Sequence, residues 1–252
     1  IKETKVIMEN GKAVNNLSAY YEKKSTPTVK SYRNAEYLNS AEARTIRIQC
    51  ELEESKWRLK RENVKATVLV FGSARAKSRT QFDNSIRDLN AQKDALPADD
   101  PERSVLDGQL ERVQAGEWMC EWFDKVFELS AKLTDWSMNS GIKLAEGRNT
   151  PGVTRYHEVV NEEARIEKAS SEKEQSFLIC TGGGPGFMEA ANMGSASITD
   201  ARSIGMAISL PFEEGVNKYI PDALAFQYHY FFTRKFWMVY YCQALIVAPG
   251  GV

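Results

Sequence analysis

The sequence predicts an α/β fold: a Rossmann-like, mostly parallel sheet flanked by helices, with an N-terminal arm and helical extension. From residue 67 onward, short apolar runs rich in β-branched residues alternate with longer helical patterns. Such continuous apolar runs are typical of strands buried on both faces. We expect an arm and helix over 1–63 and a nucleotide-binding domain over 64–252, with the C-terminal end of that domain incomplete.

The composition is that of a globular protein. Among 252 residues, 33 Lys+Arg stand against 34 Asp+Glu and 42% are hydrophobic, which excludes collagen and wholesale disorder. The longest apolar run, 236–248, is shorter than the roughly 20 residues that cross a bilayer, so we expect no membrane span. Residues 1–66 carry a net charge of +5, but without a nucleic-acid-binding motif we do not expect nucleic acid as a partner.

Metal and cofactor chemistry has little support in the sequence. The four cysteines form no CxxC pair and the two histidines stand alone, so we expect no metal site and no cofactor. A reducing compartment suits this cysteine pattern. The chain opens at Ile1 without a signal-peptide core, so we expect a cytoplasmic protein, or one of an organelle matrix or stroma if Ile1 follows a removed transit peptide.

The N-terminal part of the chain predicts one long helix. Residues 1–38 are polar and irregular and are typical of an extended arm. Asn39 followed by Glu42 has the N-cap and N3 pattern, which predicts a helix from Asn39 to Asn63. The first core strand is expected over 67–71.

The middle of the chain predicts helices followed by a surface segment. Helices are expected over 77–96 and 102–139, separated by the breaker PADDP, and 147–174 is expected to be a charged surface excursion. One broad apolar face of the second helix should pack on the sheet; it comprises Trp118, Trp122, Phe123, Val126, Phe127, Leu129 and Leu133.

The remaining elements alternate in the order of a doubly wound fold. A strand, a glycine-rich loop and a helix are expected in succession, which is the arrangement that cradles phosphate groups. The expected strands are 176–181, 204–210, 226–232 and 244–248, and the expected helices are 187–201 and 234–243.

Three of these strands end in glycine-bearing loops, at 71–74, 181–186 and 249–251. Because the carboxyl ends of parallel strands line one edge of a sheet, we expect the loops to converge on a single crevice. Glycines there let backbone N–H groups approach an anion closely. The anion-binding residues predicted from these loops are Gly72, Ser73, Gly182, Gly183, Gly184, Gly186, Pro249, Gly250 and Gly251, although Ser73 could also serve only as a turn residue.

Arg234 and Lys235 are expected in the first turn of a helix capped by Thr233. Each cation at that position interacts unfavourably with the helix dipole, at a cost of roughly 0.3–1 kcal/mol at an exposed site. A bound anion would make the interaction of these cations with their surroundings favourable. A solvated pair that points away from the helix end fits the spacing equally well. The nearby aromatic side chains belong mostly to a core or subunit interface, and one or two of them could stack on a base.

The glycine loop departs from both common nucleotide motifs. The pattern G-x-G-x-x-G read from Gly182 places Phe187 where its third glycine belongs, and no Gly-Lys-Ser or Gly-Lys-Thr is present. A mononucleotide or sugar phosphate is therefore a better expectation than a dinucleotide.

Five motifs follow one another along the chain: YLNSAEARTIRIQCELEE at 37–54, FGSAR at 71–75, CTGGGPGFMEAAN at 180–192, SLPFE at 209–213 and FFTRKFWMVYYCQALIVAPGG at 231–251. Taken in this order, they resemble the motifs of the Lonely Guy (LOG) family, the nucleoside 5′-monophosphate phosphoribohydrolases often labelled lysine decarboxylases. The N-terminal motif is similar to the helical extension of the longer, bacterial-type members.

The resemblance implies a function. It implies hydrolysis of the N-glycosidic bond of a nucleoside 5′-monophosphate, AMP-like or a cytokinin nucleotide, to free base and ribose 5-phosphate, in a homodimer or higher homo-oligomer with the site near the subunit interface. It implies that Arg234 is catalytic, that Lys235 and the glycine loops bind the phosphate, and that Met188 is also a binding residue. The partner Glu of the family motif PGGxGTxxE lies beyond Val252.

Other functions stay open at this point. A non-catalytic nucleotide-binding or scaffold subunit of a larger assembly would keep the glycine loop and Arg234, and the basic arm and charged insertions favour such a role. A nicotinamide oxidoreductase is less favoured because the dinucleotide fingerprint is incomplete. Lysine decarboxylation has no support, because nothing singles out a lysine for a pyridoxal phosphate Schiff base.

Overall fold

The computed structural model describes residues 8–9, 12–13, 28–139, 175–209 and 215–250. Its chain forms two compact units, residues 1–47 and residues 48–252. The predicted surface excursion at 147–174, most of the predicted arm and Gly251 lie outside the described residues.

The first unit contains short elements. Strand β1 (Met8–Glu9) pairs antiparallel with β2 (Lys12–Ala13). A 3-10 turn, η1 (Ser31–Arg33), is followed by α2 (Ala35–Asn39) and by the start of α3 (Arg44–Arg61).

The predicted helix start at Asn39 is wrong. Asn39 ends α2, which Asn34 caps by accepting the N–H of Tyr37, and α3 begins only at Arg44. Ser40 adopts an extended conformation with ψ 166° and interrupts the helix. The Arg47 guanidinium then donates to the carbonyls of Leu38 and Ser40 at 2.7 and 2.6 Å, so the break has its own hydrogen bonds.

The second unit is built on a five-stranded, all-parallel sheet, which confirms the predicted fold class. The strand order is β6-β5-β4-β3-β7. Successive strands β3 to β6 are therefore added in one direction, and β7 returns to the other side of β3, so the chain changes direction between β3 and β7. The strands are β3 (Thr67–Phe71), β4 (Leu178–Thr181), β5 (Ser203–Ile208), β6 (Ala225–Tyr228) and β7 (Cys242–Val247).

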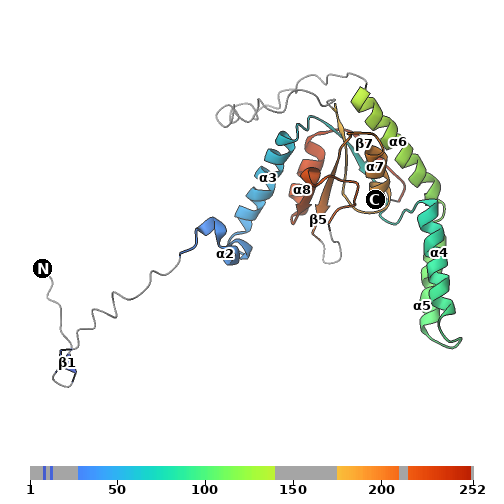
Figure 1. Ribbon diagram of the computed structural model, residues 1–252, viewed down its shortest axis with the longest axis horizontal. Coiled ribbons are helices and arrows are strands. Elements are labelled where there is room, and N and C mark those ends of the chain that lie inside the picture. Colours follow the sequence, from blue (N-terminus) through green and yellow to red (C-terminus); the bar gives the residue numbers. More distant parts are fainter. Residues whose placement is uncertain (1–7, 10–11, 14–27, 140–174, 210–214, 251–252) are drawn as a thin grey trace. The chain divides into compact units, whose positions relative to one another are not determined.

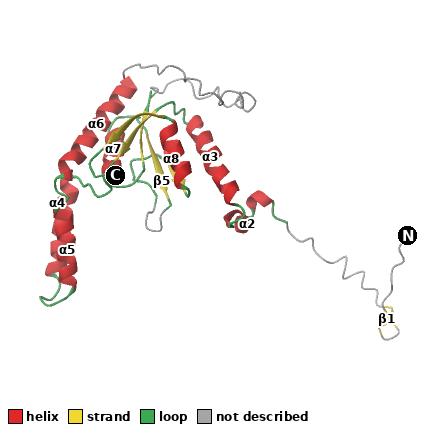
Figure 2. Cartoon of the chain, turned by 180° about the vertical axis from the view of Figure 1, so that it is seen from behind, coloured by secondary structure: helices red, strands yellow, loops and turns green. Residues whose placement is uncertain are grey.

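Helices cover both faces of the sheet, as Figures 1 and 2 show from opposite sides. On one face, Leu59 of α3 and Met238 of α8 (Phe231–Tyr240) pack in a core with Leu69 and Leu178. On the other face, Phe123 of α6 (Met119–Asn139) and Ala190 of α7 (Phe187–Ala196) pack in a second core with Val68 and Ile179. Burial of these side chains between three layers is the main stabilising contribution.

The apolar face predicted for the helix over 102–139 is only partly buried. Phe123 and Val126 are in the core, and Phe127 and Leu133 pack against it. Trp118, Trp122 and Leu129, which were expected to face the sheet, are 54%, 41% and 42% exposed. Seven apolar residues cover more of the helix circumference than one sheet contact can bury.

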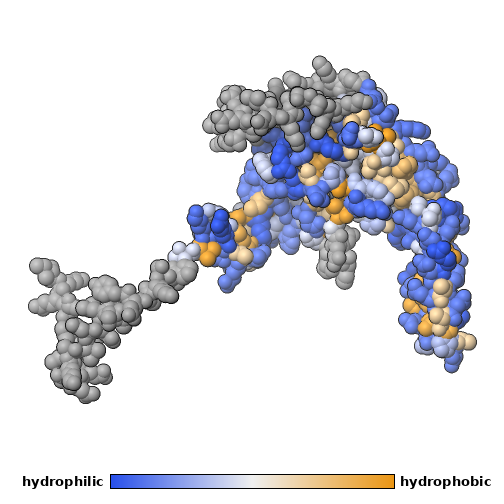
Figure 3. Space-filling model, viewed as in Figure 1, coloured by the Kyte–Doolittle hydropathy of each residue, from blue (hydrophilic) through white to orange (hydrophobic). Residues whose placement is uncertain are grey.

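The connection from β3 to α6 is a helical hairpin. It consists of α4 (Arg79–Asp94) and α5 (Glu102–Gln114), and a short turn at 115–118 separates α5 from α6, where the sequence predicted one continuous helix. Ser78 and Gln81 form a capping box at the start of α4. In the view of Figure 3 the surface of this hairpin is mostly hydrophilic.

The ends of the remaining elements differ from prediction by several residues. Helix α7 stops at Ala196 and α8 starts at Phe231, three residues earlier than expected, which leaves β6 shorter than predicted. None of the helices in the described residues is both long and apolar enough to cross a bilayer.

Two helical glycines provide a test of the packing between α6 and α7. A Cβ on Gly194 would lie 2.3 Å from the Phe127 carbonyl oxygen, whereas a Cβ on Gly108 of α5 would meet nothing within 4 Å. We expect Gly194→Ala to lower the free energy of unfolding by about 2 kcal/mol or more through overpacking. Gly108→Ala should raise it by about 0.5–1 kcal/mol because alanine restricts the unfolded chain. Urea denaturation of both variants measures the difference, and equal effects would contradict the close helix contact.

Candidate functional site

The three glycine-bearing loops meet at Ser73, beside the point where the chain changes direction between β3 and β7. The N–H of Phe187 donates to the Ser73 carbonyl oxygen at 3.2 Å. A Cβ built on Gly250 would lie 3.5 Å from the Ser73 Cβ. The loops after β3, β4 and β7 thus come together as expected, and this edge of a parallel sheet is where ligands bind in such folds.

Glycine is required at two of these contacts. Gly186 has a φ of +74°, and a Cβ there would lie 2.2 Å from the Ser73 carbonyl oxygen. A Cβ on Gly72 would lie 2.7 Å from the Phe187 Cβ and 2.9 Å from the Ala248 Cβ. Side chains at either position would push the loops apart, so both glycines have a structural role whatever the site binds.

The Ser73 hydroxyl has a local partner. Its Oγ accepts the N–H of Arg75 at 3.2 Å, and the residue is buried. This is a turn stabilised by a serine hydroxyl, one of the two roles left open for this residue. Its hydroxyl hydrogen still has the capacity to donate to a ligand.

A buried polar network joins the glycine loop to α7 and β5. The Thr181 Oγ1 accepts the N–H of Gly183 at 2.9 Å and donates to the Asn192 Oδ1 at 2.7 Å. Asn192 in turn donates to the Ser203 Oγ at 2.9 Å. Every residue in this series of hydrogen bonds is fully or almost fully buried, so the hydrogen bonds fix the loop strongly.

Asn217 also forms hydrogen bonds to the glycine loop. Its backbone N–H donates to the Gly183 carbonyl at 2.7 Å, and its side-chain amide donates to the carbonyls of Gly183 and Gly184 at 3.2 and 3.3 Å. Sequence reasoning missed both Asn192 and Asn217. A buried asparagine within the apolar pattern of α7 was an available signal for the first, whereas Asn217 stands in a segment without a pattern.

The position of Arg234 differs from the prediction in its helix context. Helix α8 starts at Phe231, so Arg234 is its fourth residue, and its N–H already donates to the Tyr230 carbonyl at 3.2 Å. Thr233 lies inside the helix and is not the cap: its Oγ1 lies 2.8 Å from the Tyr230 carbonyl oxygen.

The Arg234 guanidinium lies at the end of β4. Its Nε donates to the Met206 carbonyl at 2.6 Å and its Nη2 to the Gly182 carbonyl at 3.4 Å. Strand β4 ends at Thr181, which pairs with Gly205, so Met206 faces the point where β4 leaves the sheet. The guanidinium therefore binds the Met206 carbonyl just beyond the last residue of β4 that pairs with β5. A Cβ on Gly182 would lie 2.5 Å from its Nη2.

Met188, Lys235 and Pro249 complete the predicted set. The Met188 Sδ would lie 2.9 Å from a Cβ on Gly182, and its Cε 2.9 Å from one on Gly184, so this side chain lies along the glycine loop. Lys235 is exposed, and among the described residues it has no hydrogen-bond or ion-pair partner. Pro249 is partly buried between Ala248 and Gly250.

Glu51 holds the start of α8 in place. Its carboxylate accepts the N–H of His229 at 2.7 Å and of Tyr230 at 3.4 Å, and it lies 2.5 Å from the Thr233 Oγ1. Helix α8 has no acidic residue in its own first turn, so a carboxylate from α3 supplies the cap. Nothing in the sequence points to a cap from a residue about 180 positions away.

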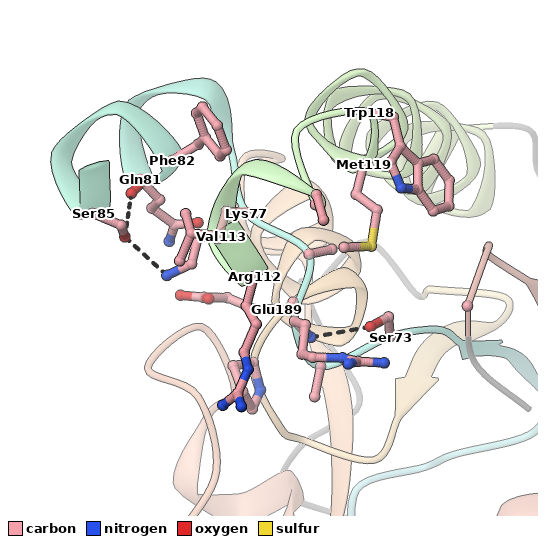
Figure 4. Close-up of a pocket in the computed structure, with 18 of the residues that line it drawn as sticks. Ser73, Lys77, Gln81, Phe82, Ser85, Arg112, Val113, Trp118, Met119 and Glu189 are labelled. Carbon is pink, nitrogen blue, oxygen red and sulfur yellow. Dashed lines mark hydrogen bonds between the residues drawn. The ribbon is translucent and has the colours of Figure 1, made fainter. Parts of the chain in front are cut away.

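A cavity of about 830 Å³ opens beside the meeting point of the loops. Ser73, Gly186 and Gly250 line one end, and residues of α4, α5 and the start of α6 line the other (Figure 4). Arg234, Lys235 and Met188 do not line it. The predicted site residues are thus divided between this cavity and the Arg234 side of the glycine loop.

The cysteine that precedes the glycine loop in β4 is not a nucleophile. Cys180 is completely buried in β4, and desolvation raises the pKa of its thiol to about 12. The nearby Arg234 opposes this shift only in part. The group therefore stays a thiol at neutral pH and has a packing role.

No group of three or more histidine, cysteine or carboxylate side chains in the described part of the chain could hold a metal ion. No protein-family model matches the chain, and a comparison with curated proteins finds no significant match.

The Glu51 cap leads to a stability test. We expect Glu51→Ala to lower the free energy of unfolding by about 2 kcal/mol, because it leaves backbone N–H groups at the start of α8 without their charged acceptor. The matched control is Glu53→Ala on the same helix, where the carboxylate accepts from the exposed Gln49 amide at 3.1 Å and, among the described residues, from no other group. That variant should change stability by less than about 0.5 kcal/mol. Equal losses in urea denaturation would show that Glu51 is not a specific cap.

Proposed function

We propose that the protein hydrolyses the N-glycosidic bond of a nucleoside 5′-monophosphate, AMP-like or a cytokinin nucleotide, to free base and ribose 5-phosphate. One observation carries this proposal: three glycine-bearing loops and Arg234 gather at the carboxyl edge of one parallel sheet. Glycines and a helix start at that edge favour a phosphate group, and the resemblance of the same segments to the LOG family supplies the reaction.

In this proposal the phosphate lies on the loops and Arg234 acts on the reacting nucleotide. Helix α7 begins directly after Gly186, so its N-terminal dipole favours an anion there. Arg234 is held by two backbone carbonyls, so its guanidinium is already oriented before a ligand binds. Such preorganised charge is the usual means of stabilising a transition state.

The proposed reaction breaks the C1′–N bond and forms a C1′–O bond to water, with one water proton going to the departing base and the other staying on the new 1′-hydroxyl of ribose 5-phosphate. Positive charge develops on the sugar ring, so a carboxylate is needed to stabilise it or to direct the water. On the resemblance this carboxylate is the Glu of the family motif PGGxGTxxE, whose first three residues match Pro249, Gly250 and Gly251.

A homodimer or higher homo-oligomer forms part of the proposal. Three phenylalanines of α8 support it: Phe231 and Phe232 are 54% exposed and Phe236 is 47% exposed, all on the helix that carries Arg234. Exposed aromatic groups of this kind mark interaction surfaces. A cytoplasmic, matrix or stromal location is proposed on the cysteine pattern alone.

The second candidate is a nucleotide-binding subunit that does not turn over its ligand. The buried network beneath the glycine loop and the two carbonyl contacts of Arg234 favour a rigid binding site as much as a reacting one. Both candidate functions include binding of the nucleotide phosphate, and they differ only in whether the base is released.

The test is incubation of the full natural protein with AMP, GMP, CMP and UMP, followed by chromatography of free base and ribose 5-phosphate. We expect release from at least one nucleotide, and a loss of about 100-fold or more in kcat/KM for Arg234→Ala, as for removal of a transition-state donor. Arg234→Lys keeps the charge but loses the planar donor geometry, and should recover only part of the activity.

The control is Arg61→Ala, which removes an exposed arginine stacked on Trp57 of α3 and should leave kcat/KM unchanged. Because Arg234→Ala also removes the donor to the Met206 carbonyl, the melting temperature of each variant is measured in parallel. Nucleotide binding without any base release would favour the second candidate. Wild-type kcat/KM in a folded Arg234→Ala variant would remove the catalytic role of this residue.

A further inference from the structure

The end of the cavity away from the glycine loops is built by the α4–α5 hairpin, which is firmly held. Arg103 donates to the carbonyls of Lys93 and Leu96 at 2.6 and 2.8 Å, which satisfies the C-terminal end of α4. Arg79 contacts Glu117 at 2.7 Å and so joins the start of α4 to the turn before α6. A wall fixed at both ends can position side chains for a ligand.

Three cations line this cavity. Arg75 and Lys77 come from the loop that begins at Ser73, and Arg112 comes from the last turn of α5. The Lys77 Nζ donates to the Ser85 Oγ at 3.0 Å, and Ser85 donates to the Gln81 carbonyl at 2.8 Å, so the ammonium group is oriented by a neutral partner (Figure 4). Within the described residues, the Arg75 and Arg112 side chains have no hydrogen-bond or ion-pair partner.

Two carboxylates, Asp88 and Glu189, line the same cavity, so its charged side chains sum to one net positive charge. Neither forms an ion pair with the three cations, and Asp88 contacts Arg87, at 3.7 Å. The cations are therefore not neutralised within the cavity. Planar guanidinium groups suit phosphate oxygens because they donate in pairs.

The cations continue directly from the proposed phosphate cradle. Arg75 and Lys77 follow Ser73 by two and four residues in one loop, and this loop leads into α4. We propose that the cavity between this loop and the α4–α5 hairpin is a polyphosphate site: a nucleoside diphosphate binds with one phosphate at Ser73 and Gly186 and the second on Lys77, Arg112 and Arg75.

This inference extends the proposed function, because it rests on the same phosphate cradle at Ser73 and Gly186. A nucleoside diphosphate bound there would compete with a monophosphate and would inhibit its hydrolysis. The hairpin would then act as a selector of phosphate-chain length.

The test is isothermal titration of the full natural protein with AMP and ADP in a buffer that contains EDTA. We expect the Kd of ADP to be at least tenfold lower than that of AMP, and Arg112→Ala and Lys77→Ala each to reduce this ratio toward one. The matched control is Lys132→Ala, an exposed lysine of α6 that is paired with Glu128 outside the cavity, which should keep the wild-type ratio. Arg112→Gln, which replaces the guanidinium with a shorter, neutral amide that can still donate hydrogen bonds, checks that any loss reflects charge and not folding.

Equal affinities for AMP and ADP in the wild-type protein would overturn the inference, and so would an unchanged ratio in both cavity variants or no binding of either nucleotide. Failure of the proposed function looks different: ADP would bind more tightly than AMP while no nucleotide released its base. Base release with equal AMP and ADP affinity would overturn the polyphosphate site alone.

Discussion

The close approach of the β3 and β4 loops at Ser73 is the constraint on which the candidate site depends. The N–H of Phe187, the first residue of α7, donates to the Ser73 carbonyl, and only a glycine at 186 leaves room for that contact. The same contact places the start of α7 beside β3 and β7, where the chain changes the direction in which it adds strands. A phosphate cradle, a helix N-terminus and the strand edge coincide because of this one approach.

Hydrogen bonds from distant parts of the chain keep the loops in place. Thr181, which is bonded to Asn192, accepts the N–H of Gly183, and Asn217 donates to the carbonyl of the same glycine. Arg234 binds the Met206 carbonyl just beyond the end of β4. Each of these groups is bound to backbone atoms or to another buried side chain. The site is therefore formed before any ligand arrives, so little binding energy is needed to order it.

Much of the architecture followed from pattern alone, because buried parallel strands and glycine turns leave strong local signals. Strands β3, β4 and β7, the glycine-loop helix and the meeting of the loops were predictable from TVLVF, SFLICT, ALIVA and the glycines after them, and β5 and β6 from the segments 204–210 and 226–232. The break between α5 and α6, the start of α8 and the role of Thr233 were not, because tertiary contacts decide them. Glu51 lay outside prediction for the same reason, since its partners are 178 to 182 positions away.

The Glu51 cap has a consequence for the order in which the protein folds. It closes a loop of 182 positions between α3 and α8, and the entropy of closing a chain segment grows with its length. The contacts around Thr181 and Asn192 span only 11 positions and can form early. The sequence separations therefore favour early formation of the contacts around Thr181 and Asn192, and late anchoring of the start of α8, which requires that α3 has already met α8.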